Sequence, residues 1–258
     1  MLETAAAASV VSLFRYPVKG LSAEPLDRID VTPGRTFPND RVYAVEHGGP
    51  RFDPDAPAWL PKVAFLCLMK DAPLASLASR HDAATGELTL SDEGRPILRA
   101  DLRSAAGREA VAAALAPYRG PGRDGALRVV EAAGHSFSDV PQKAVSIVNL
   151  ASVRSLEAHS GRSIDPLRFR ANLYIDGLPA WAERHWVAST VRIGDGVQMK
   201  IFKTTTRCAA TEVEPGSGAR DLDMIDLVEH VTDDNVCGVY GEVTAPGTLA
   251  PGQPIVVG

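Results

Sequence analysis

One thiol in this chain stands beside a fixed positive charge. Cys208 follows Arg207 and a run of three threonines, Thr204 to Thr206. A cation next to a cysteine favours the thiolate, which is the form that binds metals and acts as a nucleophile. The segment therefore indicates a metal-binding or nucleophilic cysteine. A core cysteine at the end of a strand is the alternative interpretation.

The other two cysteines are explained as core residues. Cys67 lies inside the apolar run 63–69, and Cys237 lies at the entrance of a strand-like segment. A buried cysteine behaves as a small hydrophobic side chain. Three cysteines are too few for an iron–sulfur cluster, which needs about four thiolates. The odd number and the lack of a Cys-x-x-Cys pair also argue against a disulfide scaffold and a structural zinc site.

Positive side chains gather at three other places in the sequence. Arg168 and Arg170 flank Phe169, and on a strand both would lie on one face because side chains alternate. Two guanidinium groups on one face suit a phosphate or a similar oxyanion, since they are planar bidentate donors. A solvated sheet edge is the alternative. Lys19 and Arg41 allow the same two interpretations, and together the clusters suggest a thiolate in a cationic pocket for an anionic cofactor.

Composition restricts the class of protein. The chain has 258 residues, of which 45% are hydrophobic and 23% charged, as in ordinary globular proteins of one large or two small domains. A formal net charge of -5 gives no global reason to bind nucleic acid or an anionic membrane. No apolar run approaches the roughly 20 residues that span a bilayer. Residues 1–10 contain no basic residue and do not resemble a secretory signal, so we expect a cytoplasmic protein.

Short strand-like segments dominate the chain. They cover residues 10–16, 26–31, 41–45, 63–69, 87–90, 173–175, 190–193, 197–202, 238–243 and 255–257. Helices are predicted over 104–117, 149–161 and 223–231, with Ser104 and Asn149 as N-caps. This pattern predicts a mainly β (α+β) fold of barrels or sandwiches. The Gly-rich stretch 119–125 is the expected linker between domains 1–125 and 126–258.

The order and spacing of these residues resemble the MOSC-domain proteins, which are named for the C-terminal domain of molybdenum cofactor sulfurase. The matching segments are Tyr16-Pro17-Val18-Lys19, Asp40-Arg41, Phe137-Ser138-Asp139, Asn149 to Ser152, Arg168 to Asn172, Thr206-Arg207-Cys208 and Gly238-Val239-Tyr240. The resemblance implies an N-terminal MOSC-type β-barrel domain followed by a C-terminal MOSC β-barrel with a few short helices.

The resemblance also implies a site for the molybdenum cofactor, Mo-molybdopterin. In the amidoxime-reducing branch of the family, the cysteine that matches Cys208 is the protein's own ligand to molybdenum. Arg207 is expected to stabilise this thiolate and to bind a cofactor oxygen. The positions expected to hold the pterin or its phosphate are Lys19, Arg41, Asn149, Ser152, Arg170, Asn172 and Thr206. Asn149 and Ser152 would act at a helix N-terminus, where free N–H groups bind anions.

The resemblance to the amidoxime-reducing branch implies an oxidoreductase that reduces N-hydroxylated compounds such as amidoximes, hydroxylamines and N-hydroxylated bases. The chain has no convincing flavin, nicotinamide, haem or iron–sulfur motif, so electrons are expected from a separate ferredoxin-like protein or flavin reductase. Two alternatives stay open. One is a sulfur-transfer protein related to molybdenum cofactor sulfurase, in which Cys208 accepts or relays sulfur. The other is a non-enzymatic carrier of the cofactor.

Overall fold

The computed structural model describes residues 8–49 and 51–258. Residues 1–7, which make up most of the segment assessed above as a secretory signal, lie outside this description. The described residues are 34% strand and 20% helix, which confirms the predicted mainly β fold class. Within them, no helix combines the length and the apolar character that a membrane crossing requires.

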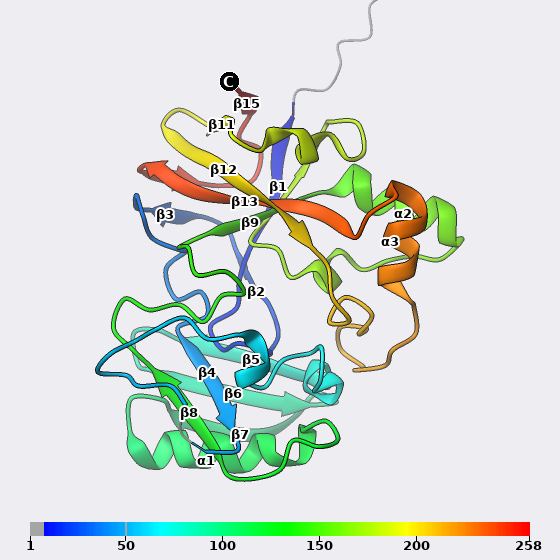
Figure 1. Cartoon of the computed structure of the whole chain (residues 1–258). Helices are drawn as coiled ribbons and strands as arrows, with labels where there is room; N and C mark the ends of the chain where they lie inside the picture. Colours follow the sequence, from blue (N-terminus) through cyan, green and yellow to red (C-terminus); the bar gives the residue numbers. More distant parts are fainter. Residues whose placement is uncertain (1–7, 50) are drawn as a thin grey trace, which may run out of the picture.

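One large curled sheet forms the upper part of the molecule in Figure 1. Its strand order is β15-β11-β12-β13-β9-β10-β1-β2. The strands are β1 (Ser9–Arg15), β2 (Glu24–Leu26), β9 (Val145–Asn149), β10 (Leu173–Asp176), β11 (Thr190–Ile193), β12 (Val197–Thr206), β13 (Val236–Ala245) and β15 (Ile255–Val257). The amide of Ile255 donates to the carbonyl of Ala8 at 2.8 Å, and the amide of Val10 donates to that of Gln253 at 3.0 Å. β15 is the strand at one edge of this sheet, and β1 lies next to the strand at the other edge. These hydrogen bonds therefore bring the two sides of the curled sheet together.

Alternation of side chains explains why these residues form a curled sheet. In β12, Val197, Met199 and Ile201 are buried, while Gln198 and Lys200 between them are exposed. Strand residues two apart share a face, so the apolar set points to one side. The apolar faces of the other strands of this sheet join the same core, which fixes the register of β12 and β13 and so the place where each strand ends.

Two helices lie beside this sheet. They are α2 (Leu150–Ser160) and α3 (Met224–Thr232), and they pack against each other (Figure 1). The side chain of Asn149 caps α2, and Asp223 caps α3 by accepting from the amide of Asp226 at 3.0 Å. Gly161 ends α2 in the left-handed conformation with φ 65°. Both helices begin within one residue of the predicted positions.

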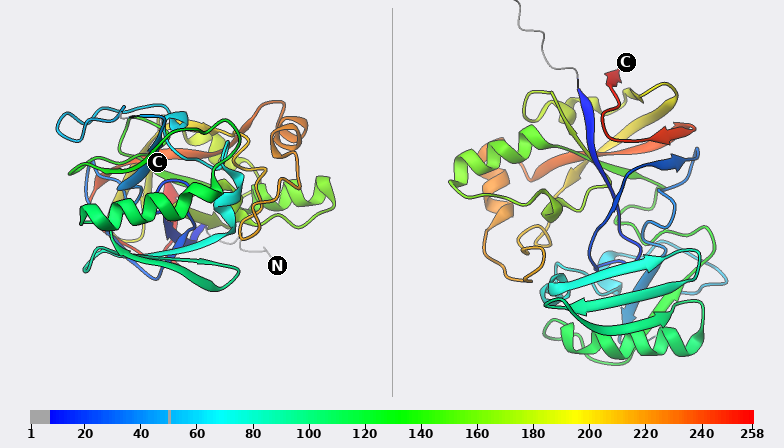
Figure 2. Two further views of the ribbon diagram at one scale, coloured as in Figure 1. Left: turned by 90° about the horizontal axis from the view of Figure 1, so that it is seen from below. Right: turned by 180° about the vertical axis from the view of Figure 1, so that it is seen from behind.

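The lower part of the molecule contains smaller sheets and one helix (Figure 2). β4 (Tyr43–His47) pairs with β8 (Leu127–Glu131), and β5 (Leu77–Asp82), β6 (Glu87–Asp92) and β7 (Arg95–Asp101) form a three-stranded sheet. The helix α1 (Ala105–Leu115) packs on β7 and β8. Ser104 caps it as predicted, accepting from the amide of Gly107 at 2.9 Å. A separate two-stranded sheet, β3 (Ile29–Val31) and β14 (Gly247–Leu249), packs on the core of the large sheet in the upper part of the molecule (Figure 1).

The large sheet takes strands from both sides of residue 125. β1 precedes this position and pairs with β10. In the separate two-stranded sheet, β3 also precedes it and pairs with β14. The division into domains 1–125 and 126–258 stays a prediction. The expected linker is anchored, because the amide of Gly120 donates to Asp71 at 2.9 Å and Arg123 pairs with Asp71 at 3.2 Å.

The apolar run 63–69 is not the strand that was predicted. It begins in the short 3-10 helix η1 (Lys62–Ala64) and continues with a single bridge between Phe65 and Glu46. The buried Arg123 side chain donates to the carbonyls of Val63 at 2.8 Å and Phe65 at 3.1 Å. A side chain thus satisfies carbonyl groups that a neighbouring strand would otherwise pair. Four other 3-10 helices occur among the described residues: η2 (Ala72–Ser76), η3 (Ala116–Tyr118), η4 (Pro166–Phe169) and η5 (Ala182–Trp186).

Arg168 and Arg170 do not lie on a strand, so the shared face considered for them does not exist. Arg168 lies in the 3-10 helix η4, and Arg170 follows it in the left-handed conformation with φ 50°. Asp165 accepts from the amide of Leu167 at 2.8 Å, and Pro166 occupies the first helical position. An Asp cap followed by Pro favours a helix start. Sequence analysis did not use this signal at Asp165 and Pro166. The two arginines therefore have different surroundings.

Candidate functional site

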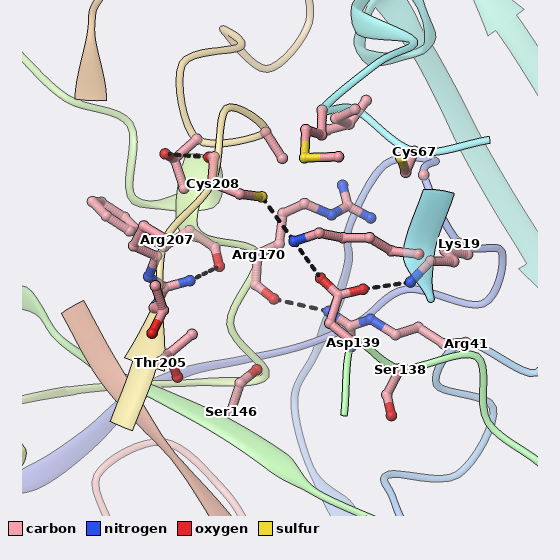
Figure 3. Close-up of a pocket in the computed structure, with 18 of the residues that line it drawn as sticks. Lys19, Arg41, Cys67, Ser138, Asp139, Ser146, Arg170, Thr205, Arg207 and Cys208 are labelled. Carbon is pink, nitrogen blue, oxygen red and sulfur yellow. Dashed lines mark hydrogen bonds and ion pairs between the residues drawn. The ribbon is translucent and has the colours of Figure 1, made fainter. Parts of the chain in front are cut away.

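A pocket lies between the large sheet and the smaller sheets, and both halves of the sequence line it (Figure 3). The first half contributes Lys19, Gly20, Arg41, Lys62, Cys67, Leu68 and Met69. The second half contributes, among others, Ser138, Asp139, Ser146, Arg168, Arg170, Asn172, Thr205, Thr206, Arg207, Cys208 and Tyr240. Seven of the predicted site residues are therefore brought together: Lys19, Arg41, Arg170, Asn172, Thr206, Arg207 and Cys208.

Cys208 follows the end of β12 and is half-buried in this pocket. Its sulfur accepts a hydrogen bond from Lys62 Nζ at 3.0 Å. Arg207 does not contact the sulfur; its guanidinium donates to the carbonyls of Cys237 at 2.7 Å and Phe169 at 2.9 Å. Adjacent side chains of an extended segment point to opposite sides. The cation in hydrogen-bond contact with the thiol therefore comes from the first half of the chain. The expectation that Arg207 stabilises the thiolate stays a prediction.

Three side-chain polar atoms of residues that line the pocket are buried without a partner among the described residues. They are Nη2 of Arg207, Nε of Arg168 and Oγ1 of Thr205. Leaving such a group unpaired costs about 1–3 kcal/mol, so a bound acceptor would be stabilised here. Gly238 permits this geometry, because a Cβ at its position would lie 3.0 Å from Arg207 Nη2. The pocket thus offers donor capacity that the described residues do not use.

A carboxylate joins two lysines across the pocket. Asp139 pairs with Lys19 at 2.5 Å and with Lys62 at 3.7 Å. Burial alone would raise the pKa of Asp139, but Lys19 and Lys62 outweigh it and hold this pKa well below its usual range. Burial lowers the pKa of Lys62, and Asp139 and Cys208 raise it more, so that the net shift is upward. Asp139 is therefore ionised and Lys62 is a cation near neutral pH.

Two arginines share the ring of Tyr16. The guanidinium of Arg170 lies 4.3 Å from the ring centroid, and that of Arg41 lies 4.7 Å from it. Arg41 pairs with Asp40 at 2.5 Å, and this carboxylate raises its pKa against the effect of burial. Burial lowers the pKa of Arg170, and the nearby Arg41 adds to the shift. Arg170 donates to the carbonyl of Leu21 at 2.8 Å and, within the described residues, forms no ion pair.

Arg168 is neutralised, in contrast to Arg170. Its guanidinium pairs with Asp221 at 2.7 Å and with Glu214, and it donates to the carbonyl of Glu212 at 2.9 Å. Of the two arginines interpreted as a fork for an oxyanion, only Arg170 keeps an uncompensated charge at the pocket.

Asn172 lines the pocket, but its amide is used within the fold. It accepts from Ser146 Oγ at 2.9 Å and donates to the carbonyl of Phe14 at 3.2 Å. It therefore ties β1 to β9 and holds a wall of the pocket. Thr206 lies at the exposed end of β12, also on the pocket lining.

Asn149 and Ser152 lie outside the pocket lining. Asn149 accepts from the amide of Ala151 at 3.1 Å and donates to the carbonyl of Pro179 at 2.9 Å. Ser152 is buried and donates to Glu183 at 3.1 Å. Their side chains cap and anchor α2, so the structure does not bring these two residues to the other seven. The sequence shows a helix cap here, and that part of the prediction is confirmed.

Sequence analysis missed Lys62 and Asp139 as site residues. Lys62 stands alone between Pro61 and an apolar run, with no pattern that distinguishes it from a surface lysine. Asp139 is part of Phe137-Ser138-Asp139, so the signal was present, but nothing in the sequence places its carboxylate between two lysines. Both became visible only through contacts between distant segments.

Comparison with known proteins finds a match to one described type of domain. Residues 134–256 match the MOSC domain. The matched range includes the second-half wall of the pocket and Cys208, whereas Lys19, Arg41 and Lys62 lie before it.

Among curated proteins, mitochondrial amidoxime-reducing component 1 of Mus musculus is 28% identical over 121 residues. The match covers 42% of this chain and 35% of that protein, so the chain spans about a third of the relative's length. Among solved structures, the YUAD protein from Bacillus subtilis is 14% identical with a TM-score of 0.46, over 97% of this chain and 95% of that one. YiiM from Geobacillus stearothermophilus is 18% identical with a TM-score of 0.35, over 44% of this chain and 53% of that one.

Proposed function

We propose that this protein binds the molybdenum cofactor in the pocket around Cys208 and reduces N-hydroxylated compounds such as amidoximes, hydroxylamines or N-hydroxylated bases. The observation that carries the proposal is the half-buried thiol of Cys208, which lies in a pocket lined by cations with unused donor capacity. The MOSC domain and the name of the mouse relative, an amidoxime-reducing component, support the same function.

The residues present fit such a cofactor. It carries a phosphate and a metal that is already bound by soft sulfur, and thiolates are suitable further ligands for soft metals. Arg170 has no ion pair among the described residues, and Arg207 Nη2 and Thr205 Oγ1 are buried without partners. These are the groups that an anionic ligand with many acceptor atoms would satisfy. The one carboxylate at the centre, Asp139, is already paired with Lys19 and Lys62.

Each residue has a separate part in the proposal. Cys208 provides the protein ligand to molybdenum, and the cofactor when bound supplies the two-electron redox chemistry. Lys19, Arg41 and Arg170 balance the negative charge of the pterin and its phosphate. Arg207 and Thr206 donate to cofactor oxygens at the end of β12, and Asn172 supports the wall against which the cofactor rests. Asn149 and Ser152 are not included, because the fold uses both side chains elsewhere.

The reaction consumes two electrons and two protons and converts an N–OH group into N–H and water. A separate protein, ferredoxin-like or a flavin reductase, supplies the electrons in this proposal. A cytoplasmic location belongs to the proposal as well.

The test is to purify the chain from cells that make the cofactor and to measure molybdenum by mass spectrometry and oxidised pterin by fluorescence. We expect both at near-stoichiometric amounts, together with reduction of an aryl amidoxime by reduced viologen. Cys208→Ser should remove activity and most of the metal. Cys237→Ala, at a buried cysteine outside the pocket lining, should keep both.

The outcomes separate the three functions. Full activity in Cys208→Ser would exclude the thiolate as metal ligand. A persulfide on Cys208, with no metal or pterin in the purified protein, would indicate sulfur transfer. Bound cofactor without reductase activity, but with release to an acceptor enzyme, would indicate a carrier.

A further inference from the structure

Lys62 reaches the pocket thiol from a distant part of the chain. Its Nζ donates to the sulfur of Cys208 at 3.0 Å and lies 3.7 Å from Asp139. Asp139 is itself held by Lys19, whose Nζ also donates to the carbonyl of Phe137 at 2.8 Å. The ammonium group therefore has two fixed acceptors, and Figure 3 shows the dashed contacts that run from Cys208 to Asp139 and on to Lys19.

The backbone beneath Lys62 is fixed by a buried arginine. Arg123 donates to the carbonyls of Val63 at 2.8 Å and Phe65 at 3.1 Å, the residues just after Lys62. Arg123 is only 7% exposed and pairs with the fully buried Asp71 at 3.2 Å. A charged pair that is buried and hydrogen-bonded holds its partners in one geometry. The short helix η1, and with it the base of the Lys62 side chain, thus rests on a rigid support.

A second contact ties the same segment to the opposite wall. Trp59 Nε1 donates to the carbonyl of Ser138 at 3.3 Å. Residues 59–62 therefore touch both the segment that carries Asp139 and the sulfur of Cys208. A flexible surface lysine has no such anchoring, and its rotamer entropy would work against a fixed contact.

We infer that Lys62 is a positioning residue for the Cys208 sulfur, and that it adjusts the reduction potential of a metal bound there. The second part rests on the proposed function. A hydrogen bond to a ligand sulfur withdraws electron density from it, and a nearby cation stabilises the more reduced state of a metal. Lys62 thus acts through Cys208 rather than on the substrate.

The first experiment needs no cofactor. Cys208 alkylation by iodoacetamide is followed by intact mass at one fixed pH in the wild type, Lys62→Met and Lys62→Arg. We expect Lys62→Met to react several-fold more slowly, because no cation lies beside its sulfur, and Lys62→Arg to recover much of the rate. Lys70→Met, at an exposed lysine outside the pocket lining, should match the wild type. Equal rates in the wild type and Lys62→Met, with unchanged melting temperature, would overturn the positioning role.

The second experiment uses the loaded protein. A redox titration followed by the Mo(V) signal should give a lower potential in Lys62→Met than in the wild type, and a potential near the wild type in Lys62→Arg. An unchanged potential at normal metal content would overturn the redox part. If the wild type carries no molybdenum or pterin, the proposed function fails, whereas the alkylation series still decides the positioning role of Lys62. If Lys62→Met does not fold, Lys62→Gln replaces it in both series.

Discussion

At the scale of single residues, the three cysteines differ sharply in their surroundings. Cys237 is fully buried, and burial raises its pKa to about 12. Burial also raises the pKa of Cys67. Cys208 is half-buried and lines the open pocket. We predict that iodoacetamide at pH 8 modifies Cys208 alone in the native protein, and peptide mass spectrometry checks this. Rapid native labelling of Cys237 would show that the core around β13 opens.

Asp139 gives a prediction for acidic pH. Its folded pKa is depressed below the usual range by Lys19 and Lys62. Such a carboxylate stabilises the fold above its unfolded pKa of about 3.9, and this contribution is lost as the pH falls through the folded pKa. Asp139→Asn should therefore be less stable than the wild type at pH 7, by about 1 kcal/mol, because Lys19 loses its ion pair but the side chain of Asp139 is 43% exposed and solvent screens the pair. Urea titrations from pH 7 to 3 should show the difference shrinking below pH 4.

The sequence alone could predict the residues that carry a local signal. Cys208, Arg170 and Lys19 stand in short polar motifs, and the structure brings them into one pocket. Lys62 could not be predicted, because its contact with Cys208 joins residues 146 positions apart. The local sequence around Lys62 or around Cys208 gives no information about where the other residue lies. Arg207 shows the reverse case, since adjacency in sequence suggested a contact that the alternation of side chains prevents.

At the scale of elements, β5 carries an unusual core residue. His81 is 4% exposed, lies 5.3 Å from Tyr43 between ring centroids, and has no partner for either ring nitrogen. Burial lowers its pKa. The unfolded chain therefore binds a proton on His81 more readily, and stability falls as the pH drops through its unfolded pKa of about 6.5.

His81→Phe should remove this proton-linked loss. We expect the variant to be as stable as the wild type or more stable at pH 7, because the unpaired nitrogens are gone. Between pH 7 and 5 its melting temperature should fall less steeply. Calorimetry across this range checks the slope, and equal slopes for the two proteins would mean that His81 is not protonated on unfolding.

β13 depends on a glycine where it passes β9. Gly238 has φ +83°, and a Cβ there would lie 2.4 Å from the carbonyl of Ile147. Gly238→Ala should lower the free energy of unfolding by about 2 kcal/mol or more. Gly252→Ala is the matched control, because its φ is +85° but nothing lies within 4 Å of the added Cβ. Equal losses in the two variants, measured by urea denaturation, would assign the whole effect to backbone strain.

Elements were predictable where periodicity and caps agree, as for α2 with Asn149 and Gly161. They were not predictable where a distant side chain replaces the expected partner. The run 63–69 is apolar enough for a strand, but Arg123 takes the carbonyls of Val63 and Phe65. Asp165, just before the segment 166–170, is the cap of η4 and is followed by Pro166, and these two residues were the only local signal for the short helix.

At the scale of the whole molecule, the large sheet contains strands from both halves of the sequence, since β1 pairs with β10. A separate two-stranded sheet pairs β3 with β14. We predict that a fragment of residues 126–258 shows no cooperative thermal transition by circular dichroism, because it lacks the strands that residues 9–31 supply. A sharp transition close to that of the full chain would instead support the division into domains at residue 125.

The pocket has a consequence for the order of events during synthesis. Its lining begins with Lys19 and ends with Tyr240, so a ribosome must translate nearly the entire chain before the last wall exists. β13, which carries Tyr240, also completes the pairing of β12 with β9. A nascent chain that has not been made through Tyr240 therefore lacks a complete pocket. If the proposed function holds, the cell must keep the cofactor protected until this last wall has formed.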